Sequence, residues 1–197
     1  MSGDTANSGR RRFLTLATTV VGAVGAGFTL VPFVSSMQPS AKARAAGAPV
    51  RADISKLNPG QMIRVKWRGK PVWIVKRTDD MLKTVTELDS VVSDPESVDS
   101  IQPDYARNEY RYIKPEILIL VGICTHLGCS PTFRPDVSPV DLGKDWKGGF
   151  FCPCHGSKFD LAGRVYAGVP APTNLPVPPH RFVSDNEIVI GEDGEVA

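Results

Sequence analysis

The chain has 197 residues, of which 42% are hydrophobic and 22% are charged, and its formal net charge is +2. From residue 51 onward, 18 basic and 20 acidic residues nearly balance, which argues against a nucleic-acid-binding surface. The sequence contains no internal repeat, nucleotide-binding loop or nucleophile–base set. Its function must therefore come from other residues.

Three consecutive arginines, Arg10 to Arg12, stand directly before a long apolar segment. Together with Phe13 and Leu14 they are typical of a twin-arginine export signal. The alternative is a positive-inside anchor that uses no special export route. Both interpretations place residues 1–12 in the cytoplasm.

Residues 13–41 carry no charge, and the apolar run from Phe13 to Val34 would form a helix about 33 Å long. A helix of that length crosses the roughly 30 Å hydrocarbon core of a bilayer. We therefore expect a single transmembrane anchor at residues 13–36. Small residues around Ala43 leave signal cleavage open, although the apolar run is longer than that of a usual signal peptide.

The stretch 40–49 is rich in alanine and has no large core-forming side chain. A segment of this composition cannot bury enough apolar surface to fold alone. We expect residues 37–50 to form a flexible hinge. The remainder of the chain, residues 51–197, has the size of one domain.

Two hairpins indicate that this domain is mainly β. Alternation over residues 63–67, a turn at 68–70 and an apolar run at 72–75 predict the first hairpin. The second is predicted over residues 182–190, with its turn at Asp185 and Asn186.

Short apolar strands are also predicted at residues 117–121 and 150–151, each leading into a cysteine motif. The long polar segment between the motifs, residues 132–149, is expected to be irregular. The acid-rich residues 79–104 are expected to form a solvated helix and loop.

All four cysteines and two of the three histidines fall in two segments, C-T-H-L-G-C at 124–129 and C-P-C-H-G-S at 152–157. Each segment offers a Cys followed closely by a His, and two such pairs can bind an iron–sulfur cluster with imidazoles on one iron. A structural zinc site and plain disulfides are the alternatives, and the ligand spacing favours the cluster. His180 lies outside both segments and is expected to be a packing or surface residue.

These motifs resemble those of the Rieske iron–sulfur subunits of ubiquinol:cytochrome c oxidoreductase, the respiratory cytochrome bc complex. The resemblance runs from the anchor to about residue 190. It implies an antiparallel β-sandwich head with a small cluster-binding subdomain at about 118–178. It also implies one 2Fe–2S cluster whose ligands are Cys124, His126, Cys152 and His155.

The resemblance further implies a disulfide between Cys129 and Cys154 that ties the two segments together. Such a bond requires an oxidising compartment. Closing a loop of about 25 residues contributes roughly 3 kcal/mol of stability in the chain-entropy model.

Three more features take roles from the same resemblance. The Ser157 hydroxyl would donate to a bridging sulfide and raise the potential, and the loop Gly168–Pro172 would cover the cluster. Plain turns are the alternative for both. Phe159 stands where better-known members have a Tyr that donates to a ligand sulfur. We therefore expect a potential lower than theirs but still in the high class.

By resemblance, His155 hydrogen-bonds ubiquinol and accepts its proton, and the cluster passes one electron to a cytochrome c-type haem. The implied partners are cytochrome b and a cytochrome c-type subunit, in a dimeric complex that couples the reaction to proton translocation. The head would swing on its hinge at the periplasmic side of a bacterial inner membrane. An anchored Rieske subunit of a plastoquinol oxidoreductase or of an arsenite oxidase is the nearest alternative.

Overall fold

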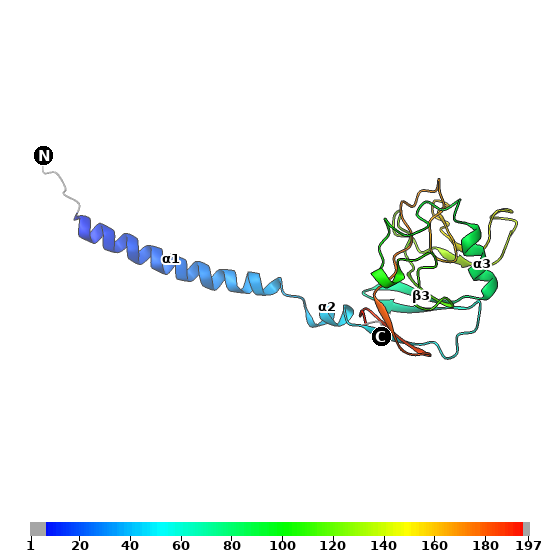
Figure 1. The fold of residues 1–197 in the computed structure, drawn as a ribbon. Helices are drawn as coiled ribbons and strands as arrows, with labels where there is room; N and C mark the ends of the chain where they lie inside the picture. Colours follow the sequence, from blue (N-terminus) through cyan, green and yellow to red (C-terminus); the bar gives the residue numbers. More distant parts are fainter. Residues whose placement is uncertain (1–6, 195–197) are drawn as a thin grey trace. The chain divides into compact units, whose positions relative to one another are not determined.

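The structure is a computed structural model that describes residues 7–194. The first half of the predicted cytoplasmic segment, residues 1–6, lies outside the described residues, as do residues 195–197. The chain divides into two units, residues 1–45 and 46–197 (Figure 1).

The first unit is built on helix α1, Ser8–Ser36. The Asn7 side chain caps its N-terminus by accepting from the amides of Gly9 and Arg10. The helix begins five residues before the predicted anchor and ends at its predicted last residue. None of its residues is buried, and it is long and apolar enough to span a membrane. A helix so exposed and apolar needs a lipid or protein environment around it.

Hydroxyl groups in α1 are satisfied by the helix itself. The Thr15, Thr18 and Thr29 hydroxyls each donate to the backbone carbonyl four residues earlier. This arrangement leaves no hydroxyl proton of these three unpaired in an apolar environment. Pro32 lies inside the helix, which continues past it to Ser36.

A short helix, α2, Ala41–Ala46, lies within the segment predicted to be a flexible hinge. It contains no buried residue, and the stability of an isolated helix of this length is marginal in water. The hinge itself therefore stays a prediction.

The described part of the head contains three antiparallel sheets, ordered β1-β9-β8, β2-β3-β4 and β5-β6-β7, as the sequence predicted for a mainly β domain. The strands are β1 Val50–Asp53, β2 Met62–Trp67, β3 Lys70–Lys76, β4 Ile117–Val121, β5 Thr132–Arg134, β6 Gly149–Phe151, β7 Lys158–Phe159, β8 His180–Ser184 and β9 Glu187–Ile190. Helix α3, Asp79–Glu87, and a 3-10 turn, Asp104–Ala106, complete the head.

The sheet β2-β3-β4 is the middle layer of the head (Figure 1). Residues of one face, including Ile74 and Ile119, pack with Ile188 of the sheet β1-β9-β8. Residues of the other face, including Trp73 and Leu120, pack with the two cysteine motifs. All five residues of β4 are buried, because both of its faces are covered.

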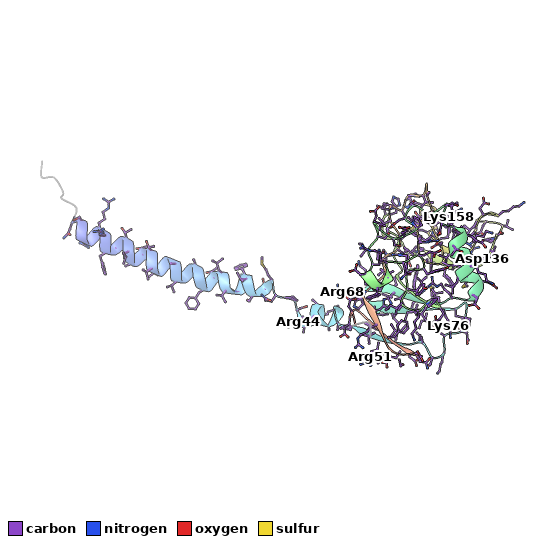
Figure 2. The ribbon with its side chains drawn as sticks, in the orientation of Figure 1. Arg44, Arg51, Arg68, Lys76, Asp136 and Lys158 are labelled. Carbon is purple, nitrogen blue, oxygen red and sulfur yellow. A yellow bond between two sulfur atoms is a disulfide. The ribbon has the colours of Figure 1, made fainter. Side chains whose placement is uncertain are left out.

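The first predicted hairpin is confirmed as β2 and β3. Its two turn residues, Arg68 and Gly69, have φ angles of +49° and +75°, which are typical of a type I′ turn. Figure 2 labels Arg68, in this turn, and Lys76, the last residue of β3. The second predicted hairpin is confirmed as β8 and β9.

The segment 132–149 was expected to be irregular throughout, and this is wrong for its first three residues and its last. Residues 132–134 form β5, which pairs with β6 so that Phe133 lies opposite Phe150. The ring centroids of these two residues are 5.4 Å apart. Trp146 is also fully buried, and its indole N–H donates to the Arg134 carbonyl.

The acid-rich segment 79–104 holds the predicted helix, which is capped by the Thr78 hydroxyl. Its loop is not merely solvated, however. Asp89 forms an ion pair with the fully buried Arg164, and Asp94 accepts three hydrogen bonds from the turn that follows it. Each carboxylate has a specific partner that sequence position alone did not indicate.

Candidate metal centre

Two loops with the same hydrogen-bond pattern form the centre: loop 1, residues 124–129, follows β4, and loop 2, residues 152–157, joins β6 to β7. In loop 1 the Cys124 amide donates to the carbonyl of Cys129, the last residue of the loop, at 2.7 Å. In loop 2 the Cys152 amide donates in the same way to the carbonyl of Ser157, the last residue of that loop, at 2.8 Å. Each loop therefore turns back on its own first cysteine.

A glycine completes each turn. The amides of Gly128 and Gly156 donate to the carbonyls of Cys124 and Cys152, at 3.1 and 2.9 Å. Both glycines have positive φ angles, +84° and +78°, a conformation that side chains with a Cβ rarely adopt. The glycine in each motif is thus required by the backbone of the loop.

The free thiols of the two loops lie together in the core. Cys124 and Cys152 are 3% and 2% exposed, and they belong to the same apolar cluster as Phe150. Burial raises the pKa of the Cys152 thiol, and the neighbouring Cys124 thiol adds to the increase. Two adjacent thiols in such a place suit a metal ion that would bind them as thiolates.

The two imidazoles also lie together. The rings of His126 and His155 are 4.8 Å apart between centroids and nearly perpendicular, at 88°. Nδ1 of His126 is buried and finds no hydrogen-bond partner among residues 7–194, whereas the His155 side chain reaches solvent. A buried unpaired nitrogen costs about 1–3 kcal/mol, so this atom fits a metal ligand.

A disulfide joins the loops, as expected: Cys129 of loop 1 is bonded to Cys154 of loop 2, with Cα atoms 6.7 Å apart. The sulfur atoms of this disulfide and of Cys152 lie within 4.8 Å of one another. The bond therefore sits beside the thiol pair and limits how far the two loops can separate.

Comparisons with known proteins agree with this geometry. The family model described as "Rieske [2Fe-2S] domain" matches residues 49–179, and the model "Ubiquitinol-cytochrome C reductase Fe-S subunit TAT signal" matches residues 1–40. The chain is 63% identical over 193 residues to the ubiquinol-cytochrome c reductase iron-sulfur subunit of Allochromatium vinosum, covering 98% of this chain and 93% of that protein. It belongs to the Rieske iron–sulfur subunit family.

The subunit of the same name from Blastochloris viridis is 46% identical, and the match covers 96% of this Rieske chain and 97% of the relative. A solved structure of a hyperthermophilic respiratory Complex III matches with 28% identity and a TM-score of 0.48, covering 88% of this chain and 98% of the other. Family membership makes the cofactor a Rieske 2Fe–2S cluster and the N-terminal segment a twin-arginine signal.

Contacts from the proline-rich loop and from Thr173, the residue after it, reach both motifs of this Rieske chain. Ser157 is fully buried, and its hydroxyl oxygen accepts from the Ala171 amide at 3.1 Å. The Thr125 hydroxyl donates to the Thr173 carbonyl at 2.7 Å. The roles of Thr125 and Thr173 were not predicted, because a bond across 48 residues leaves no local sequence signal.

Two aromatic residues are also placed. Phe159 is fully buried in the core cluster that includes Cys124 and Cys152, so packing is one of its roles. His180 is 2% exposed, and its Nδ1 lies 2.9 Å from the Pro178 carbonyl. It is a packing residue, as predicted.

Proposed function

We propose that this chain carries one electron within a ubiquinol–cytochrome c reductase and that its cluster has four ligands. Cys124 and Cys152 would bind one iron, and His126 and His155 the other. The observation that carries the proposal is the pairing of thiol with thiol and imidazole with imidazole between two matching loops. Two cysteines and two histidines can also hold one tetrahedral zinc, and the match to the Rieske [2Fe-2S] family model favours the iron cluster.

When bound, the cluster supplies one-electron transfer from ubiquinol to a cytochrome c-type haem. Neutral imidazoles leave it less negative than thiolates would, which raises its potential. His155 is the exposed ligand, so its ring can accept the hydrogen bond and then the proton of the quinol hydroxyl. His126 is more enclosed and is given no such role.

The Ser157 hydroxyl has its oxygen occupied by the Ala171 amide. Its own proton is then available for a cluster sulfur, and such a donor stabilises the reduced state. This arrangement supports the role that resemblance gave to Ser157.

The apolar helix α1 and the twin-arginine signal support an anchored subunit. We place the head on the periplasmic side of a bacterial inner membrane, because twin-arginine export carries folded proteins outward. Cytochrome b and a cytochrome c-type subunit are the proposed partners, in a dimeric complex that couples quinol oxidation to proton translocation.

The test is an EPR spectrum of membranes that contain the full chain, reduced with ascorbate. A rhombic signal of low average g is expected, and a quinol-site inhibitor should perturb it. A signal that appears only with dithionite would contradict the high-potential role. Zinc without iron or acid-labile sulfide would overturn the cluster ligation itself.

A further inference from the structure

Residues 94–100 form a turn that is rich in hydrogen bonds. The Asp94 carboxylate accepts from the amides of Val98 and Asp99 and from the Ser100 hydroxyl, at 2.7, 3.2 and 2.6 Å. Ser97 is fully buried with a φ angle of +55°. The turn is therefore a defined structure in which Ser97 and Ser100 are buried.

Asn174 joins this turn to the proline-rich loop. It is fully buried, and its side-chain amide donates to the Asp94 carbonyl at 2.9 Å and to the Ser97 hydroxyl at 3.1 Å. Its backbone amide donates to the Ser100 hydroxyl at 3.3 Å. A buried amide with this many partners is held in one orientation.

The same side chain closes the base of the loop. Its Oδ1 accepts from the Val165 amide at 2.8 Å, which ties the residue before the segment 166–173 to the residue after it. Within that segment, the Ala171 amide donates to the Ser157 hydroxyl, and the Thr173 carbonyl accepts from the Thr125 hydroxyl. Asn174 thus fixes both ends of the segment that contacts both loops.

We infer that Asn174 is a positioning residue for the centre. It holds the proline-rich loop where the Ala171 amide orients the Ser157 hydroxyl, and through that hydroxyl it raises the potential of the cluster. The inference rests on the proposed function, because it takes a cluster sulfur as the acceptor of the Ser157 proton. Asn174 itself touches no reacting atom.

The experiment is a double-mutant cycle on the full chain in membranes, with Asn174→Ala, Ser157→Ala and the combined variant. Redox titration followed by EPR gives the ratio of reduced to oxidised cluster at the wild-type midpoint. We expect this ratio to fall about three- to tenfold in Asn174→Ala, the equivalent of one hydrogen bond. In the Ser157→Ala background, Asn174→Ala should change it by less than about twofold, because the shared pathway is already lost.

Asn108→Ala is the matched control. The Asn108 side-chain amide likewise donates two hydrogen bonds, to the backbone carbonyls of Tyr105 and Tyr112, but it makes no bond to the proline-rich loop. It should lose comparable stability without a change in potential. Additive effects of the Asn174 and Ser157 substitutions, or an unchanged potential in folded Asn174→Ala, would overturn the inference.

Two further measurements keep the test decisive. If Asn174→Ala does not fold, Ser97→Ala removes one partner of the same side chain, and its potential must shift in the same direction by about twofold. Hydrogen exchange at the Val165 and Ala171 amides should accelerate in Asn174→Ala but not in Asn108→Ala. That exchange needs no cluster, so unchanged exchange in Asn174→Ala would count against this inference alone. A failure of the proposed function would instead appear as the absence of the EPR signal in the wild type.

Discussion

Arg164 and Asp160 form an ion pair of 2.7 Å between Nε and Oδ2, and neither side chain is exposed to solvent. Asp160 also accepts from the amides of Ala162 and Arg164, so its carboxylate organises the turn that follows β7. The second partner of Arg164 is Asp89, at 2.6 Å. Since β7 comes directly after loop 2, this pair fixes the chain immediately beyond the metal centre.

Asp160→Asn should destabilise the head by roughly 3 kcal/mol, because it leaves a buried guanidinium without its buried charge partner. Unfolding of the purified chain in detergent, followed by tryptophan fluorescence, measures the change. Asp136→Asn is the control, since Asp136, labelled in Figure 2, pairs with Arg134 at a solvent-exposed position. Its loss should cost less than about 1 kcal/mol. Equal effects of the two substitutions would contradict the importance of burial.

The buried arginines show where sequence analysis reached its limit. Alternating and continuous apolar runs predicted the hairpins and β4 correctly, because a strand with buried faces has apolar residues at regular positions in the local sequence. Buried Arg77, Arg111 and Arg164 leave no such pattern, since arginine is usually exposed and each of them bonds at least one carbonyl or carboxylate that is distant in sequence. The network of Asn174 was missed for the same reason.

The metal centre was predicted more fully than the network that supports it. Cysteine and histidine are rare in this chain, so their spacing carried the ligand hypothesis, and resemblance supplied the pairing of Cys129 with Cys154, which the structure confirms. The strand β5 was missed because three residues between two prolines, Pro131 and Pro135, give too short a signal.

Ser157→Ala should lower the midpoint potential of the cluster by about 60 mV, the equivalent of a tenfold change for a one-electron couple. The reason is the loss of a donor to a cluster sulfur, while the small buried volume changes little. Redox titration of membranes gives the value. Ser157→Thr keeps the hydroxyl and should retain most of the potential, so an equal decrease in both variants would argue for packing instead.

Phe159→Tyr should raise the midpoint potential, on the order of 40 mV, by adding a hydroxyl donor near the thiol pair. Phe159 lies in the core cluster of Cys124 and Cys152, so the new group stays inside the protein. Phe150→Tyr is the control for a buried hydroxyl on the neighbouring ring, which stacks on Trp73. An unchanged or lowered midpoint in Phe159→Tyr would contradict the prediction.

His180 should make the head less stable in mild acid. Burial lowers the pKa of its imidazole below the ordinary value of 6.5, against opposing effects of the Pro178 carbonyl and Asp193. The unfolded chain therefore binds a proton at a pH where the folded one does not. The contribution is complete above about pH 6.5 and is lost, by up to roughly 1.4 kcal/mol per pH unit, as the pH falls toward the lower folded pKa.

The comparison is between the wild type and His180→Asn, which keeps a donor for the Pro178 carbonyl but cannot titrate. Unfolding free energies are measured from pH 5 to 8. Their difference should be constant above pH 7 and change below it, in favour of the variant. Parallel curves over the whole range would show that His180 does not contribute.

Replacing both Ala43 and Ala45 in α2 by proline should slow turnover of the assembled complex while leaving the EPR signal intact. Proline removes backbone amides and restricts φ, so the substitutions break this six-residue helix and stiffen the segment. If the head must swing between cytochrome b and the cytochrome c-type haem, a stiff hinge lengthens the cycle. Glycine at the same two positions also removes the helix but leaves the segment flexible. Turnover should then stay near the wild-type rate, and a loss as large as that caused by proline would assign the effect to α2 itself.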